Sequence, residues 1–147
     1  MNSPNPIPPP ASLPDLLNIE MRLGALLDVV DVYPENLDSQ AVDVHTGFVI
    51  PAYEAMKGEV ATACGQSWDN DGRKRYRTKY QDIASKWLAY KAGLAVLARA
   101  PEGSTANVDA MMWLEEPRRS YIEALFNFYH EFSSTLRSLF PDCFPSS

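Results

Sequence analysis

Three segments of the chain repeat the same apolar spacing, and this repetition constrains the fold more than any other feature. In each segment, six apolar residues follow one another at intervals of 3-4-3-4-3 along the chain. That spacing places them on one face of an α-helix, which has about 3.6 residues per turn. The three stripes are Leu16, Ile19, Leu23, Leu26, Val30 and Tyr33; Tyr80, Ile83, Trp87, Tyr90, Leu94 and Leu97; and Ile122, Leu125, Tyr129, Phe132, Leu136 and Leu139.

The stripes predict an all-α protein, folded as an antiparallel up-down bundle of helices joined by short connections. Further apolar residues beside each stripe widen it beyond the seam of a simple coiled coil. Pro117 fits the first turn of the last helix, and Pro141 stops that helix. The four main helices are expected at about 13–33, 39–64, 74–99 and 117–139, with a short extra helix at about 105–115.

The second of these helices has the least regular pattern. Val49, Ala52 and Met56 lie on a helical face, whereas residues 42–50 alternate in the manner of a strand, and Pro51 interrupts a regular helix. A single strand would have no partner elsewhere in the chain. We therefore expect a helix that is kinked at Pro51.

Proline and chain length define the expected domain organisation. Five of the first ten residues are proline, which predicts a Pro-rich arm over residues 1–12. A chain of 147 residues suits one domain, expected at 13–140, followed by a tail at 141–147.

Charge is distributed unevenly along the chain, whose formal net charge is −6. Residues 1–66 carry −7, residues 67–99 carry +5 and residues 100–147 carry −4. The positive charge is concentrated in residues 73–80, Arg-Lys-Arg-Tyr-Arg-Thr-Lys-Tyr, which we call the basic octad. Cations oppose the helix dipole at a helix start, so either the helix begins earlier, near Asp69 or Asp71, or the octad binds an anion or an acidic partner.

The octad has a structural alternative to ligand binding. Its cations could form ion pairs with Asp28, Asp31 or Glu35 of the first helix. Nucleic acid is not the expected partner, because Tyr80 lies on the apolar stripe and Tyr76 extends it, so neither is predicted to stack on a base.

Residues capable of acid–base or metal chemistry are few and scattered. His45 is expected to be a buried, hydrogen-bonded side chain, and His130 falls on the polar face of the last helix. Asp69-Asn70-Asp71-Gly72 resembles the start of a calcium loop, but the required ligands do not follow. No catalytic residue, metal site or cofactor is predicted.

Cysteine content and hydropathy bear on location. The chain contains only Cys64 and Cys143, too few for a disulfide scaffold, although a bridge between them is left open. Charges interrupt every apolar run before it reaches the length of a membrane span, and no secretory leader is recognised. We expect a cytoplasmic protein.

These observations favour a non-enzymatic protein–protein interaction module, such as an adaptor, chaperone or inhibitor. It would bind another protein, with an acidic surface if the octad takes part, through an aromatic helical face with a charged rim. Self-association is left open. The alternatives are a binder of a small apolar or anionic ligand, and a small enzyme built around His45 or His130. The predicted partner-binding residues are Arg73, Lys74, Arg75, Tyr76, Arg77, Lys79, Phe126 and Phe128.

Overall fold

The computed structural model describes residues 13–60 and 68–144, and over these residues the protein is all-α, as predicted. The expected Pro-rich arm over 1–12 and the last three residues of the expected tail lie outside the described residues.

Two long helices form a hairpin that supports the rest of the fold. They are α5 (Asn70–Arg99) and α6 (Thr105–Leu139). Each begins at a side-chain cap: Asp69 accepts a hydrogen bond from the Gly72 amide at 2.7 Å, and Ser104 accepts one from the Asn107 amide at 3.1 Å. Gly103 in the connecting turn has a φ of 79°, a backbone conformation that favours glycine.

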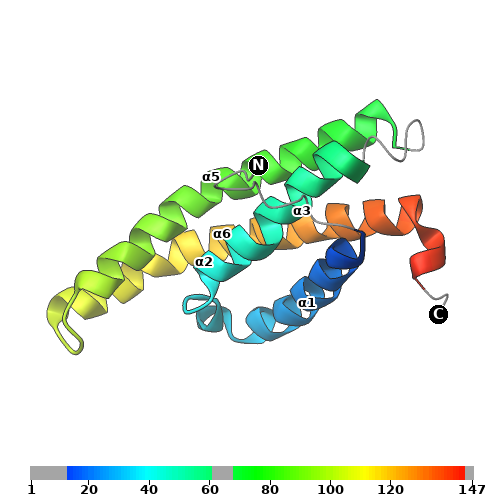
Figure 1. The fold of residues 1–147 in the computed structure, drawn as a ribbon. Helices are drawn as coiled ribbons and strands as arrows, with labels where there is room; N and C mark the ends of the chain where they lie inside the picture. Colours follow the sequence, from blue (N-terminus) through cyan, green and yellow to red (C-terminus); the bar gives the residue numbers. More distant parts are fainter. Residues whose placement is uncertain (1–12, 61–67, 145–147) are drawn as a thin grey trace, which may run out of the picture.

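The amino-terminal half of the chain packs against one side of this hairpin. Helix α1 (Leu13–Val32) is followed by a 3₁₀ turn, η1 (Pro34–Leu37), and then by a helical run. The long elements alternate in direction along the chain, and the end of the hairpin near the α5–α6 turn projects past α1 and α2 (Figure 1). The run is composed of α2 (Ala41–Val44), the π-helical turn η2 (His45–Val49), α3 (Ile50–Ala55) and a second π-helical turn, η3 (Met56–Val60).

The helical prediction for residues 39–64 is confirmed over the part described, from Ala41 to Val60. Pro51 does not end the helix. It lacks an amide hydrogen and crowds the preceding turn, and the wide turn η2 lies immediately before Ile50 and Pro51. The helical run from Ala41 to Val60 therefore continues through Pro51, with the π-helical turn η2 immediately before α3.

Two sequence-based boundaries were wrong. The predicted helices at 105–115 and 117–139 are one continuous helix, α6, with Pro117 inside it. Leu114 and Tyr121, on either side of Pro117, are fully buried, and their packing outweighs the cost of the proline. The helix given as beginning at about 74 begins at Asn70, as the alternative of an earlier start near Asp69 or Asp71 predicted, because Asp69 caps it before the basic octad.

A buried carboxylate joins α1 to α6. Glu20 of α1 accepts hydrogen bonds from the Tyr129 hydroxyl and the Ser133 hydroxyl, both at 2.9 Å, and from the Arg137 guanidinium at 3.3 Å. Gly24 lies one helical turn further along, where an added Cβ would be 2.6 Å from the Tyr129 hydroxyl. A glycine is therefore required for Tyr129 to reach Glu20.

We expect Gly24→Ala to lower the free energy of unfolding by about 1–3 kcal/mol, because the methyl group displaces the Tyr129 hydroxyl from Glu20. Urea unfolding measures this change. Gly47→Ala is the control, since a Cβ there meets nothing within 4 Å, and it should leave stability unchanged or raise it by up to about 1 kcal/mol. Equal effects of the two substitutions would contradict the predicted clash.

Candidate functional site

The basic octad lies in the first turns of α5, and its members have different environments. Tyr76 is only 1% exposed and packs on Phe128, with ring centroids 5.3 Å apart. Arg75 pairs with Glu131 of α6 at 3.6 Å, not with an acid of the first helix as one alternative expected. Lys74 and Arg77 are exposed.

The predicted aromatic binding face is largely core. Phe128 and Tyr76 are buried, so neither of these predicted partner-binding residues is available to a partner. Phe126 is half-buried. Three aromatic residues of α6, Tyr121, Phe128 and Phe132, are buried because α6 contacts both α5 and α1.

His45 is buried and hydrogen-bonded, as predicted. Its Nδ1 lies 2.9 Å from the Tyr121 hydroxyl, and its ring stacks on Trp87 with centroids 4.7 Å apart. Burial, with a smaller contribution from the positive charge of Lys91, lowers the pKa of His45 from 6.5 to about 4. At neutral pH the imidazole is therefore uncharged and serves as a packing and hydrogen-bonding group.

The second histidine, His130, is exposed on α6 beside Tyr129. Within residues 13–60 and 68–144, no three side chains of the types that bind metals are grouped so that they could hold an ion.

Protonation of His45 should couple stability to pH. The folded state binds this proton only near pH 4, whereas the unfolded state binds it near pH 6.5. The contribution of neutral His45 to the free energy of unfolding is therefore complete above pH 6.5 and is lost as the pH falls toward 4. We expect the stability advantage of the wild type over His45→Gln to shrink by about 2 kcal/mol between pH 7.5 and pH 4. Urea unfolding at several pH values measures this difference.

His130→Gln is the control for this titration. His130 is exposed, so its substitution changes a histidine without removing a buried side chain. A constant stability difference between wild type and His45→Gln across the pH range would contradict the low pKa.

A polar clamp centred on Asp38 fixes the turn between α1 and α2. Asp38 accepts two hydrogen bonds from the guanidinium of Arg118 on α6, one of them from Nε at 2.9 Å, and a third from the Tyr90 hydroxyl on α5. Burial and the hydrogen bond to Asp38 raise the pKa of Tyr90, and the hydrogen bonds that Arg118 itself donates to Asp38 raise the pKa of Arg118. The clamp thus joins three elements through one carboxylate.

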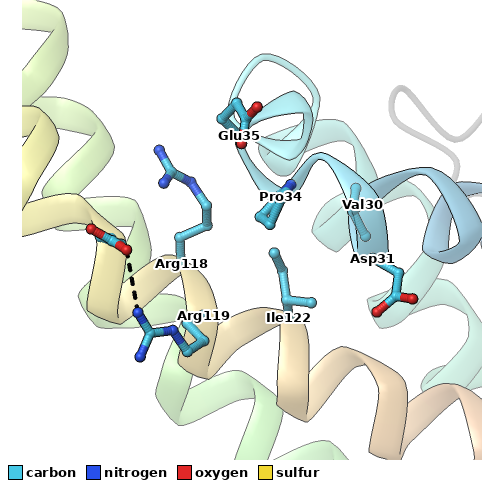
Figure 2. A pocket seen from close by; sticks show the side chains of 8 residues that line it. Val30, Asp31, Pro34, Glu35, Arg118, Arg119 and Ile122 are labelled. Carbon is cyan, nitrogen blue, oxygen red and sulfur yellow. Dashed lines mark hydrogen bonds and ion pairs between the residues drawn. The ribbon is translucent and has the colours of Figure 1, made fainter.

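A cavity of about 430 Å³ lies beside this clamp, between the end of α1 and α6. Figure 2 shows Pro34 facing Ile122 across it, with Glu35 and Asp31 on the side of α1 and η1. Arg119 is paired with Glu115 at 3.3 Å, and Arg118 is held by Asp38. The two guanidinium groups already have acidic partners, so the cavity does not present an open anion site.

Removing the clamp should destabilise the fold. Asp38→Ala leaves the largely buried Arg118 and Tyr90 without their acceptor, and we expect a loss of about 2–3 kcal/mol in the free energy of unfolding. Asp31→Ala, in an exposed residue that lines the neighbouring cavity, should change stability by no more than about 0.5 kcal/mol. Equal losses in urea unfolding would show that Asp38 is not the anchor.

The open side of the hairpin carries a groove with one aromatic side chain exposed at its end. Trp113 of α6 is 81% exposed, the largest value among the exposed large hydrophobic residues. It lines a hollow of about 480 Å³ between α5 and α6. A second hollow, of about 280 Å³, shares Lys86 and Ser120 with the first, and we call these two adjoining hollows the groove. The groove residues are Asp82, Ser85, Lys86, Ala89, Trp113, Glu116, Pro117, Ser120, Glu123, Ala124 and Asn127.

Sequence reasoning missed Trp113, although a signal was present. Ala110, Leu114 and Tyr121 form the buried stripe of α6, and Trp113 precedes Leu114 by about 100° around the helix. Extending the last helical stripe through Pro117 would have placed this tryptophan off the core. The predicted break at Pro117 prevented that step.

Comparison of the chain with protein-family models, with curated proteins and with solved structures found no match. None of the helices within the described residues combines the length and the apolar character needed to cross a membrane.

Proposed function

We propose that this protein is a non-enzymatic protein–protein interaction module and that its binding site is the groove on the open side of the α5–α6 hairpin. The observation that carries the proposal is the exposure of Trp113 at the end of that groove. Exposed tryptophan is costly in water and is enriched among residues that dominate binding energy at interfaces.

The lining of the groove supports a helical occupant. Ser85, Ala89, Ser120 and Ala124 are small, so a partner backbone can approach α5 and α6 closely between them. The groove follows the two helices over several turns, which suits the apolar face of an amphipathic helix. Trp113 would then pack over one end of that helix.

Charge around the groove favours a basic partner. Asp82, Glu116 and Glu123 contribute three negative charges, and Lys86, which pairs with Asp82 at 3.8 Å, contributes one positive charge. The rim is therefore net acidic. We propose that the occupant is an amphipathic helix of another protein with Lys or Arg beside its apolar stripe. This departs from the acidic partner that the octad alone suggested.

Two further observations support the proposed class and location. The buried ionisable side chains of Glu20 and His45 and the part-buried carboxylate of Asp38 are held by internal hydrogen bonds, an arrangement suited to structural roles. We also propose a cytoplasmic location, because the chain has only two cysteines; Cys143 is exposed, and Cys64, with which a bridge was left open, lies outside the described residues.

The proposal is tested with an 18-residue amphipathic peptide that carries lysines beside a leucine stripe and has no tryptophan. We expect binding that quenches or blue-shifts the fluorescence of exposed Trp113, because the other two tryptophans, Trp68 and Trp87, are buried. Trp113→Ala should weaken binding at least tenfold, as expected for a tryptophan that anchors an interface.

Leu88→Ala is the matched control. Leu88 is an exposed apolar residue of α5 that does not line the groove, so its variant should bind within twofold of the wild type. A peptide with glutamates in place of the lysines should bind far more weakly. Equal affinity for the two peptides, or equal losses for the two variants, would reject the groove, and a concentration-dependent dimer in sedimentation that requires Trp113 would assign it to a second copy instead.

A further inference from the structure

A second cavity, separate from the groove, lies where α3 and η3 meet the start of α5. It has a volume of about 200 Å³. Gly72 allows the indole of Trp68 to lie against the first turn of α5, where an added Cβ would be 3.0 Å from Trp68 Nε1. The cavity is lined by Tyr53, Lys57, Trp68, Arg73, Tyr76 and Arg77.

The lining combines cations with aromatic rings. Lys57 lies 5.4 Å from the centre of the Tyr53 ring, and the guanidinium of Arg73 lies 5.7 Å from that of Trp68. Arg77 is a third cation on the wall. Glu54 lies 3.4 Å from Lys57 and contributes one negative charge beside the three cations of the lining, so the positive charge exceeds the negative charge there.

Two of the lining residues carry buried hydrogen-bond donors that have no acceptor within residues 13–60 and 68–144. These donors are the Tyr76 hydroxyl and Trp68 Nε1, and the two residues are only 1% and 6% exposed. Burial raises the pKa of Tyr76 well above its usual value, so the phenol stays protonated and can donate. Unsatisfied buried donors are rare because they lose hydrogen bonds to water without replacing them.

We propose that this cavity binds a small aromatic anion, in which one planar ring carries a carboxylate or a phosphate group. The oxyanion would accept hydrogen bonds from the Tyr76 hydroxyl and the Trp68 indole and would lie beside Arg77 and Lys57. The ring would pack on the aromatic wall. The size fits, since an apolar cavity of about 150 Å³ can hold benzene and an acidic group needs little more room.

This site uses none of the groove residues, so it can be tested independently of the proposed function. Isothermal titration of the full chain would use benzoate, phenyl phosphate, neutral benzamide and inorganic phosphate at constant ionic strength. We expect saturable binding of benzoate or phenyl phosphate at one site per chain, at least tenfold tighter than benzamide or inorganic phosphate. The preferred aryl probe identifies the acidic group.

Variants distinguish the cavity from the octad as a general cationic surface. Tyr76→Phe keeps the buried ring and removes the hydroxyl, and should weaken binding on the order of tenfold. Arg77→Gln should also weaken it, whereas Lys74→Gln removes the same charge from the same turn outside the cavity and should change affinity less than twofold. Thermal melting confirms that each variant is folded.

Several results would overturn the proposal. They are the absence of saturable binding, equal affinity for benzamide, inorganic phosphate binding as tightly as the aryl probes, and equal losses for Arg77→Gln and Lys74→Gln. Indole NMR gives a second measurement that does not depend on a variant folding. The Trp68 indole signal should shift with the bound probe, and a shift confined to Trp113 would place the ligand in the groove.

Discussion

Aromatic packing between α5 and α6 is the interaction on which the rest of the structure depends. Tyr76 packs on Phe128, and Tyr90 packs on Tyr121, each with ring centroids 5.3 Å apart. These four side chains are among the largest that the protein buries completely. Their burial removes a large apolar area from water and holds the two long helices together. The remaining helices then pack on a hairpin whose position is already fixed.

Hydrogen bonds to α6 determine where the remaining elements lie along the hairpin. Apolar contacts are not directional, so burial alone would permit α1 and α2 to slide. Glu20 anchors α1 on α6 through hydrogen bonds with Tyr129 and Ser133. Asp38, which follows η1, is anchored through Arg118. His45, at the start of η2, is anchored through Tyr121. A shift of one turn would leave these polar groups without partners. We infer that they select the register and that the aromatic contacts supply most of the stability.

The sequence predicted the features that depend on the spacing of apolar residues. It did not predict those in which burial competes with the local preference of a residue. The all-α class and the extent of α1 follow directly from apolar spacing. Pro117 was assigned to a helix start because proline disfavours a helix interior, yet the burial of Leu114 and Tyr121 overrides that preference. Packing of this kind cannot be seen before the helices are placed. For the same reason Phe128 was assigned to a surface when it belongs to the core.

The candidate sites followed the same pattern. The octad was recognised as unusual from charge alone, but only the fold separates Arg77, on the wall of a cavity, from Lys74, outside it. Trp113 was overlooked because its position depends on the continuity of α6. The open groove depends on where α1 and α2 lie, and that in turn depends on hydrogen bonds between residues about 75 to 120 positions apart.

The contrast between hydrogen-bonded and unpartnered polar groups distinguishes the two candidate sites more sharply than total charge does. Glu20, Asp38 and His45 show that this protein can provide internal partners for its buried polar groups. Against that background, the donors of Trp68 and Tyr76 are exceptions, because they have no acceptor within the part of the chain that the structure describes. The exposure of Trp113 is an exception to the burial of large aromatic side chains. Departures from local consistency in a native protein concentrate where a ligand or partner completes the structure. The charges are also divided between the two candidate sites, because the rim of the groove is net acidic whereas the lining of the cavity is cationic.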